Sequence, residues 1–267
     1  MADLELTKHH GLGNDFLVVF HPHVDDLAAL ARRLCDRRRG IGADGLLVGE
    51  SEPGHAARMV LYNGDGSRAE MSGNGIRCFA QALARRRGDD LAPQRILTDA
   101  GERLVTLYAT EDPDVIEAAV DMGTVSSIAE PDDWHRIGTD SMRPVSHLSV
   151  GNPHAVVAVD DVLLVDLLSL GEKLPDINLE LVEAGPEPQA ITMRVHERGA
   201  GITEACGTGA CASAWAAVSW GLVADGLEEI TVHMDGGDAK VRLHHPEEGH
   251  VTLVGPAVFI GSIWVSV

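Results

Sequence analysis

Two short stretches with the same pattern decide the fold: Ser72-Gly73-Asn74-Gly75-Ile76-Arg77-Cys78-Phe79-Ala80 and Cys206-Gly207-Thr208-Gly209-Ala210-Cys211-Ala212-Ser213-Ala214. Each stretch opens with a small hydroxyl or thiol residue, continues with Gly-x-Gly, and leads into a run with helical spacing. The two stretches lie 134 residues apart (206 − 72). Self-similarity at a fixed spacing indicates that a structural unit is duplicated along the chain.

Two further pairs of segments repeat in the same order. Asn63-Gly64-Asp65-Gly66 lies opposite Glu197-Arg198-Gly199 at the same separation (197 − 63 = 134), and Gly13-Asn14-Asp15-Phe16 lies opposite Gly151-Asn152-Pro153-His154 at a separation of 138 (151 − 13). Three ordered pairs at nearly one spacing predict two related domains, each with one loop that leads into a helix. The polar stretch at residues 110–114 predicts the break between them.

Hydrophobic periodicity gives the fold class. Apolar and polar residues alternate in short segments that are typical of half-buried strands, at residues 4–6, 105–107, 191–195 and 251–253. Helical spacing occurs in three stretches, residues 27–34, 76–83 and 210–218, with ends expected at Asp25 or Asp26, Gly88 and Gly221. Many strands with few helices predict an α+β fold with mostly antiparallel or mixed sheets, rather than a doubly wound nucleotide-binding fold.

The composition is that of a globular protein. The 267 residues are 45% apolar and 23% charged, enough for one large or two ordinary domains with a core. A formal charge of −20 argues against nucleic acid as a partner, because phosphate binding needs a basic face. We find no signal peptide, no apolar run of membrane-spanning length and only four scattered cysteines, so we expect a cytoplasmic protein with no membrane partner.

The Gly-x-Gly loops predict an anion site. Glycine lets the backbone approach a ligand closely, and the first N–H groups of the following helix point at that ligand together with the positive end of the helix dipole. Cys206 lies directly before its helix, where its pKa is expected to be lowered. Cys35, Cys78 and Cys211 instead fall at helical positions that are typical of buried, unreactive cysteines.

Seven motifs resemble those of diaminopimelate epimerase, a family of amino-acid epimerases that work without pyridoxal phosphate. Each motif alone is weak, but their order and spacing are specific, and the match covers essentially the whole chain. The motifs are His10-Gly11-Leu12-Gly13-Asn14-Asp15-Phe16, Gly40-Ile41-Gly42-Ala43-Asp44-Gly45, Tyr62-Asn63-Gly64-Asp65-Gly66-Ser67, Gly73-Asn74-Gly75-Ile76-Arg77, Gly151-Asn152-Pro153-His154, Glu197-Arg198-Gly199-Ala200-Gly201 and Ala205-Cys206-Gly207-Thr208-Gly209-Ala210-Cys211.

The resemblance implies a more detailed fold than the periodicity does. It implies two pseudo-symmetric domains, each a mixed β-barrel-like sheet around a central helix, with the active site in the cleft between them. The last strand of the family commonly returns to the first domain, which implies that residues 258–267 do so here. The expected domains are therefore residues 1–114 with 257–267, and residues 115–256.

The resemblance also implies a reaction, the interconversion of LL- and meso-diaminopimelate on the route to lysine and peptidoglycan. In the family two cysteines act as base and acid on opposite faces of the α-carbon, with no cofactor, and Cys206 matches one of them. The expected partner is this small amino-acid substrate, and a homodimer is left open. The matched positions that would bind the substrate are Asn14, Asn63, Gly73, Asn74, Asn152, Asn178, Glu197, Arg198, Gly207 and Thr208.

These residue types suit a diamino dicarboxylate on chemical grounds as well. The guanidinium of Arg198 can form a fork around a distal carboxylate, and Glu197 and the asparagine carbonyls can accept hydrogen bonds from ammonium groups. Removal of an α-proton without a cofactor requires preorganised donors for the developing carbanion, and two helix N-termini supply them.

Ser72 stands where the family has its first catalytic cysteine. A serine hydroxyl is a much poorer base than a thiol unless a neighbour activates it. Three explanations stay open: a native serine that works as a proton donor or weak base, an engineered Cys→Ser change, or a diverged member with weak or altered activity. Ile202, where the family commonly has glutamate, is a second departure and favours the first and third explanations.

Other functions have weaker support in the sequence. Thirteen histidines invite a metal site, but none forms a His-x-x-x-His pair, and His21 with His23 or His244 with His245 lacks a third ligand at useful spacing. We therefore expect no metal. The alternative functions are a relative that binds a diamino acid with little turnover, and a racemase or dehydratase of another amino acid that uses a Ser/Cys pair.

Overall fold

The computed structural model describes residues 3–140, 142–224, 226–244 and 249–266, and the chain divides into two compact units. The first unit comprises Met1–Asp121 and Gly255–Val267, and the second comprises Met122–Val254. The break expected after residue 114 falls instead after Asp121, because the strand that follows residue 114 stays paired with the first unit's sheet as far as Val120. The return to the first unit comes at Gly255 rather than at residue 257.

Strands dominate the first unit, and two helices accompany them. Its elements are β1 (Asp3–Gly11), β2 (Asn14–Phe20), α1 (Leu27–Cys35), β3 (Gly45–Glu50), β4 (Ala57–Asn63), β5 (Arg68–Ala69), α2 (Gly73–Arg86), β6 (Gln94–Thr98), β7 (Gly101–Ala109) and β8 (Val115–Thr124), whose last residues belong to the second unit.

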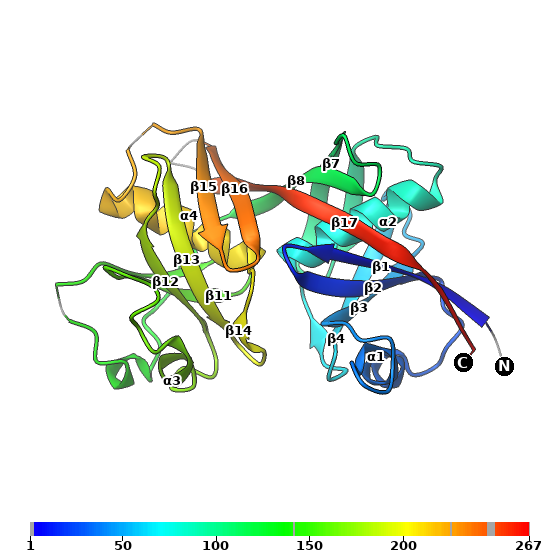
Figure 1. The fold of residues 1–267 in the computed structure, drawn as a ribbon, viewed down its shortest axis with the longest axis horizontal. Helices are drawn as coiled ribbons and strands as arrows, with labels where there is room; N and C mark the ends of the chain where they lie inside the picture. The colour runs from blue at the N-terminus through cyan, green and yellow to red at the C-terminus, as the bar shows by residue number, and fades with distance from the viewer. Residues whose placement is uncertain (1–2, 141, 225, 245–248, 267) are drawn as a thin grey trace. The chain divides into compact units, whose positions relative to one another are not determined.

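The second unit repeats this order. Its elements are β9 (Ser126–Ser127), the short 3-10 helix η1 (Trp134–Arg136), β10 (Val145–Ser149), β11 (Pro153–Ala158), α3 (Leu167–Gly171), β12 (Asn178–Ala184), β13 (Ala190–Glu197), β14 (Gly201–Thr203), α4 (Gly207–Trp220), β15 (Glu229–Met234), β16 (Gly237–His244) and β17 (His250–Ser266), whose last residues belong to the first unit (Figure 1).

The strands of the first unit close into a barrel. β1 pairs antiparallel with β2, β2 runs parallel to β3, β3 pairs antiparallel with β4, and β4 runs parallel to β6. β6, β7 and β8 then pair antiparallel in turn, and β17 pairs with both β8 and β1. The residues of β17 that pair with β1 run from Val258 to Ser266, which confirms the returning strand expected at residues 258–267, except for Val267, which lies outside the described residues.

The strands of the second unit pair in the same order. β10–β11, β12–β13 and β15–β16 are antiparallel, whereas β11–β12 and β13–β15 are parallel. β16 pairs with β17, and β10 pairs with β9. Each strand of this unit thus has a counterpart in the first, and the mixed barrel expected for both domains is present.

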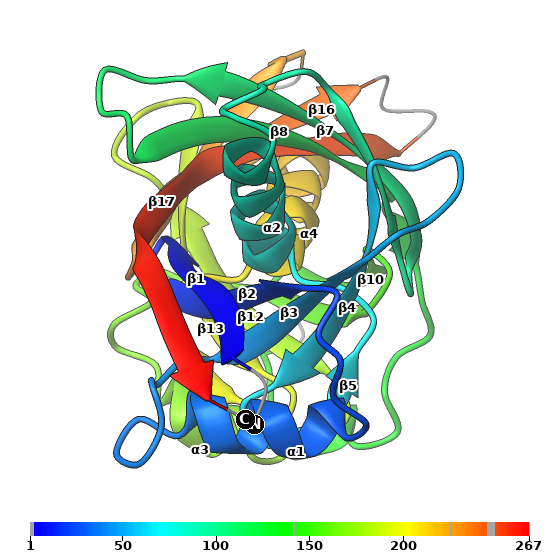
Figure 2. The same ribbon diagram turned by 90° about the vertical axis from the view of Figure 1, so that its right-hand side faces the viewer.

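Each barrel surrounds one helix. α2 contacts β1, β2, β3, β4 and β7, and α4 contacts β10, β11, β12, β13, β15 and β16. Twelve of the fourteen residues of α2 and ten of the fourteen of α4 are buried, so these two helices form the cores of their units. Figure 2 shows α2 surrounded by the strands of the first unit. The many small residues of α4 suit this enclosed position, since close-packed interiors leave little space around a central backbone, whereas α2 also buries the large side chains of Arg77 and Phe79.

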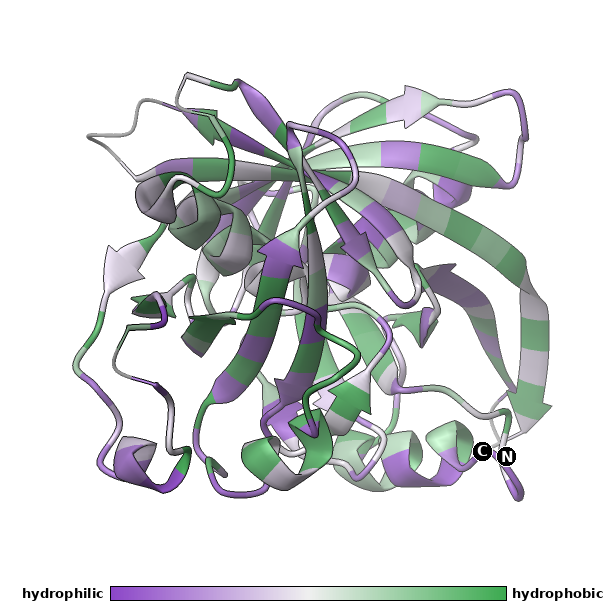
Figure 3. Cartoon of the chain, turned by 60° about the vertical axis from the view of Figure 1, so that its left-hand side comes forward, coloured by the Kyte–Doolittle hydropathy of each residue, from purple (hydrophilic) through white to green (hydrophobic). Residues whose placement is uncertain are grey.

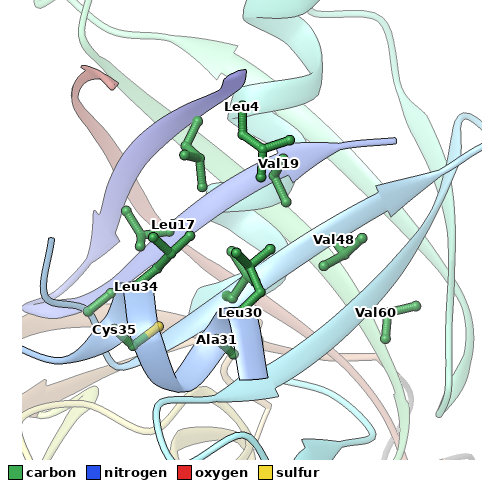
Figure 4. Close-up of a cluster of buried hydrophobic side chains, with 12 residues drawn as sticks. Leu4, Leu17, Val19, Leu30, Ala31, Leu34, Cys35, Val48 and Val60 are labelled. Atoms are coloured by element: carbon green, nitrogen blue, oxygen red, sulfur yellow. The ribbon is translucent and has the colours of Figure 1, made fainter. Parts of the chain in front are cut away.

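Sequence patterns account for most element boundaries. α1 begins after Asp26, whose side chain accepts a hydrogen bond from Ala29 N, and α4 ends at Gly221 in the left-handed conformation (φ 73°). Figure 3 shows the alternation of hydrophilic and hydrophobic residues as bands along the strands. The apolar stripe of α1 packs on the outer face of the first sheet, against Leu17, Val19 and Val48 (Figure 4). Of the described residues, no helix has the length and apolar character needed to cross a membrane.

Candidate active site

The two residues that open the repeated stretches are helix N-caps. Ser72 caps α2, and its Oγ accepts a hydrogen bond from the N–H of Gly75 at 3.0 Å. Cys206 caps α4, and its Sγ accepts one from the N–H of Gly209 at 3.4 Å. The same local structure thus places a hydroxyl at one helix N-terminus and a thiol at the other.

The glycines of the repeated loops are required by close approach. A Cβ atom at Gly75 would lie 3.0 Å from Ser72 Cβ, and one at Gly209 would lie 2.7 Å from Glu180 Oε1 and 3.3 Å from Cys206 Sγ. Each glycine is therefore required because neighbouring atoms leave no room for a Cβ atom. In the second unit one of these neighbours is a carboxylate oxygen, Glu180 Oε1.

In the first unit a chain of hydrogen bonds orients two predicted substrate-binding asparagines. Arg77 Nη2 donates to Asn74 Oδ1 at 2.7 Å, Asn74 Nδ2 donates to Asn14 Oδ1 at 3.3 Å, and Asn14 Nδ2 donates to Asp44 Oδ2 at 2.7 Å. Arginine can only donate and an ionised carboxylate can only accept. Because the chain has a donor at one end and an acceptor at the other, both amide groups are held in one orientation.

The acceptor end of that chain is itself held by charges. Arg37 Nη2 lies 2.7 Å from Asp44 Oδ1 and 2.7 Å from Asp15 Oδ1, and Lys8 Nζ lies 2.9 Å from Asp15 Oδ2. Burial acts to raise the pKa of Asp15, but the hydrogen bonds from Arg37 and Lys8 hold it below its ordinary value. The Asp15 carboxylate therefore stays ionised, and the ion pairs of Arg37 with Asp15 and Asp44 hold the Asp44 oxygen that accepts from Asn14.

Asn63 is placed differently. It is exposed at the end of β4, and its Nδ2 donates to Ser67 Oγ at 3.0 Å within the turn that leads to β5. The structure therefore does not join it to the hydrogen-bond chain of Asn14 and Asn74.

In the second unit the predicted residues lie around Cys206. Asn152 Nδ2 donates to Thr208 Oγ1 at 3.2 Å, and Thr208 Oγ1 lies 3.5 Å from Cys206 Sγ. Asn178 Oδ1 accepts the N–H of Arg198 at 2.9 Å, which fixes the turn after β13, while the Arg198 side chain is exposed. Asn152, Thr208 and Cys206 are thus brought into one hydrogen-bonded group.

Glu197 approaches the same thiol from the end of β13. Burial raises the pKa of Glu197, against the lowering effect of its hydrogen bonds with Thr203 and Cys206. The Thr203 hydroxyl donates to Glu197 Oε1 at 2.5 Å. A carboxylate with a raised pKa, hydrogen-bonded to a thiol, is suited to exchange a proton with it.

The pKa of Cys206 moves in the direction opposite to the expected one. Burial raises the pKa well above its ordinary value, and the carboxylates of Glu197 and Glu180 raise it further. The hydrogen bonds from Thr208 and from Gly209 N–H lower it, as expected at a helix N-terminus, but they are outweighed. The expectation of a lowered pKa is therefore wrong, because the sequence does not show that the thiol is buried beside two acids.

The other cysteines behave as the sequence indicates. Cys78 is fully buried inside α2, and desolvation raises its pKa to about 12. Cys35 is buried in α1, and desolvation raises its pKa to about 12 as well. Both are poor sources of thiolate, so neither replaces the cysteine that the family has in place of Ser72.

Sequence reasoning missed a buried pair under α4. His154 and Glu180 have no exposed surface, and His154 Nδ1 lies 2.6 Å from Glu180 Oε1. His154 stands in a recognised motif, which is a signal that could have found it. Glu180 gave none, because a glutamate between Leu179 and Leu181 in an alternating strand is typical of an outward-facing position.

The described part of the chain holds no cluster of three or more His, Cys, Asp or Glu side chains that could bind a metal ion.

Comparisons with known proteins agree with these motifs. The family model described as diaminopimelate epimerase matches residues 6–128 and 146–260. The chain is 37% identical to a diaminopimelate epimerase of Desulfitobacterium hafniense, covering 96% of each chain, and 38% identical to one of Agathobacter rectalis, covering 97% of this chain and 99% of that one. A solved structure described as a predicted epimerase, from Pseudomonas aeruginosa, has the same fold (TM-score 0.77, 18% identity, 99% of each chain). The chain belongs to the diaminopimelate epimerase family.

Proposed function

We propose that this protein inverts the α-carbon of diaminopimelate, interconverting the LL and meso forms by proton transfer without a cofactor. The observation that carries the proposal is the match to this family over nearly the whole chain, with Cys206 at the N-cap of a buried helix. The reaction is an isomerisation, and no atom is gained or lost overall.

Cys206 is the proposed proton-transfer group on one face of the α-carbon. When the thiol ionises, the hydrogen-bonded Glu197 carboxylate takes up its proton. The thiolate then removes the α-proton and becomes a thiol, leaving a carbanion that the α-carboxylate delocalises. In the reverse direction the same thiol returns the proton. The raised pKa of Cys206 suits this second role, because a weakly acidic thiol keeps its proton until the carbanion forms.

The first N–H groups of the two central helices are the proposed donors to the α-carboxylate. The caps use the N–H groups of Gly75 and Gly209, whereas the proposed donors are those of Gly73 and Asn74 in α2 and of Gly207 and Thr208 in α4. N–H groups held rigidly by a helix stabilise a developing negative charge without reorganisation.

The proposed contacts to the rest of the substrate come from turns. Asn14, Asn63, Asn152, Asn178 and Glu197 offer oxygen acceptors for the ammonium groups. The exposed guanidinium of Arg198 offers two parallel donors for the distal carboxylate.

Ser72 is the proposed proton donor on the other face. Its hydroxyl oxygen accepts a hydrogen bond from Gly75 N–H, and a serine hydroxyl is a much weaker base than the thiol that the family has at this position. The two directions of the reaction should therefore release the α-proton at very different rates. Deuterium exchange at the α-carbon, started separately from the LL and meso forms in D2O, measures this. Equal and fast exchange from both forms would contradict the role of Ser72.

A substitution at position 72 gives a second test of this role. Ser72→Cys restores the residue of the family and should raise the exchange rate from the slower stereoisomer, roughly tenfold or more, because a thiol is the better base. Ser72→Ala serves as the matched control that removes the hydroxyl. An unchanged or lower exchange rate in Ser72→Cys would show that the serine does not limit proton removal.

A binding protein with little turnover is the second candidate, and a serine in place of the family's cysteine at position 72 favours it, because a hydroxyl is the weaker base. Calorimetry with diaminopimelate, run beside the exchange assay, separates the two functions. Binding without exchange favours the binding protein, and binding with exchange favours the epimerase. We place either activity in the cytoplasm, because a thiol that transfers protons must stay reduced.

A further inference from the structure

Arg77 lies inside the first unit, one turn into α2, and its side chain is fully buried. The guanidinium extends back towards the start of the helix, as helical side chains do. Its Nη1 donates to Gly73 O at 3.3 Å, and its Nη2 donates to Asn74 Oδ1 at 2.7 Å. Its Nε donates to Pro256 O at 3.2 Å, in β17. One side chain therefore connects the first two residues of α2 with the strand that returns to this unit.

Two glycines leave room for this guanidinium. A Cβ atom at Gly11 would lie 3.1 Å from Arg77 Nη2, and a Cβ atom at Gly255 would lie 3.3 Å from Arg77 Cζ. A side chain at either position would press on the planar group, since packed interiors have little free space. The guanidinium is thus enclosed between the end of β1 and the start of the segment that returns to the first unit.

The fold itself does not require an arginine at this place. α2 and α4 both have fourteen residues, and their separation of 134 (207 − 73) places Cys211 opposite Arg77. Ser149 lies opposite Gly11, at the separation of 138 found for the turns that follow them (149 − 11). Cys211 is fully buried as well. The same barrel thus packs around its central helix with a small residue at this position.

The helix by itself does not favour an arginine here. The N-terminus of a helix carries the positive end of the helix dipole, which repels a cation beside it. Burial adds the cost of removing the guanidinium from water. The same positive charge, however, favours an anion that binds at this N-terminus.

One of the hydrogen bonds of Arg77 reaches a peptide group that the proposed function needs. Gly73 O and Asn74 N–H belong to the same planar peptide group and point in opposite directions. Because the guanidinium holds the carbonyl oxygen, the N–H stays directed out of the helix N-terminus. A charged donor at the carbonyl also polarises the peptide group, which makes its N–H a stronger donor.

We propose that Arg77 is a positioning residue for the α-carboxylate of the substrate. It holds the Gly73–Asn74 peptide group from behind, through Gly73 O and the Asn74 side chain, and so fixes the Asn74 N–H as a carboxylate donor. The contact with the carboxylate rests on the proposed function, whereas the hold on the peptide group does not. At α4 the corresponding residue is Cys211, and a thiol is only a weak donor. The N–H groups of α2 are therefore the stronger carboxylate donors.

NMR tests the hold on the peptide group without any substrate. The carbonyl carbon of Gly73 and the amide of Asn74 both respond to a hydrogen bond at Gly73 O. In Arg77→Lys these signals should move, because an ammonium group lacks the planar fork that reaches two acceptors at once. The corresponding signals of Gly207 and Thr208 in the second unit are the internal control and should stay in place.

Arg77→Met removes all donors of the guanidinium and should move the Gly73 and Asn74 signals further than Arg77→Lys does. This variant is expected to be less stable, so its dispersed amide spectrum must first show that it is folded. If Arg77→Met does not fold, Arg77→Lys decides the question. Gly73 and Asn74 signals that keep their wild-type positions in a folded variant would overturn the proposal.

Calorimetric titration with meso-diaminopimelate tests the role in substrate binding. In Arg77→Lys the Kd should rise roughly tenfold, which corresponds to the loss of one hydrogen bond to a charged group. A merely structural role would lower the amount of binding-competent protein, and hence the stoichiometry, without changing Kd. Arg85→Lys is the matched control, because Arg85 contacts Pro113 O and Asp114 Oδ1 from the last turn of the same helix. It should bind as the wild type does.

The two experiments distinguish failure of this proposal from failure of the proposed function. A wild type that does not bind diaminopimelate refutes the proposed function, and the Gly73 and Asn74 signals still decide whether Arg77 holds the peptide group. Signals that move in Arg77→Lys without any change in Kd would show that the carboxylate donor lies elsewhere, which overturns the positioning role.

Discussion

His9 makes the stability of the first unit sensitive to acid. The side chain is fully buried, its Nδ1 lies 2.8 Å from Gln81 Oε1 in α2, and its Nε2 lies 2.9 Å from Thr7 Oγ1. Burial lowers its pKa from 6.5 to about 4, although the hydrogen bond with Gln81 opposes the shift. The folded protein therefore keeps this imidazole neutral at pH values where the unfolded chain protonates it.

The sign and size of the effect follow from this difference. As the pH falls below 6.5, the unfolded state binds a proton that the folded state does not bind, so the free energy of unfolding decreases until the pH passes about 4. A shift of this size corresponds to about 3 kcal/mol in the limit and about 2.5 kcal/mol near pH 4.5, as orders of magnitude.

Urea unfolding of the wild type and of His9→Gln, at about pH 8 and about pH 4.5, measures the effect. Many carboxylates also titrate in this range, so the quantity of interest is the difference between the two proteins. The wild type should lose about 2 kcal/mol more than His9→Gln between the two pH values, whereas the neighbouring change His10→Gln should behave as the wild type does. Equal losses in the wild type and His9→Gln, or an NMR titration of His9 with a midpoint near 6.5, would refute the reasoning.

Two further predictions concern the helix N-termini. Arg77→Met should lower the free energy of unfolding by about 3 to 5 kcal/mol, measured by chemical denaturation. The substitution removes a fully buried guanidinium that has three oxygen acceptors within 3.3 Å, and those acceptors lose their donor. A loss below about 1 kcal/mol would contradict this prediction. Gly209→Ala should reduce the deuterium-exchange rate more than Gly75→Ala does. The new methyl group meets Glu180 Oε1 at 2.7 Å in Gly209→Ala, whereas it meets Ser72 Cβ at 3.0 Å in Gly75→Ala. The reverse order of rates would show that the carboxylate under α4 can move away.

The sequence predicts the fold well because the signals of the fold are local and repeated. The strand alternation, the three helices and the duplicated Gly-x-Gly loops each depend on neighbouring residues, and all are present. The helix α3 was not predicted, since only five residues form it. The first boundary between units was placed too early, at residue 114, because a polar stretch marks a turn but does not show where strand pairing stops.

The site was predicted less completely because its chemistry depends on contacts between distant residues. The N-cap positions of Ser72 and Cys206 follow from the pattern, and both are confirmed. The direction of the Cys206 pKa shift was wrong, since burial beside Glu197 and Glu180 cannot be read from a linear sequence. The role of each predicted residue as a substrate contact stays a prediction.

The two copies of the duplicated fold place different kinds of residues under their central helices. Under α2 the first unit has apolar residues, Phe16 and Leu47, and its charged groups orient the amides of Asn14 and Asn74. Under α4 the second unit has an acid and an imidazole, and its hydrogen bonds lead to a thiol. Because the two barrels share their strand order, these differences are not imposed by the fold. The serine at position 72 is therefore consistent with the rest of its unit, where the polar groups hold and orient, whereas the groups able to exchange protons gather in the second unit.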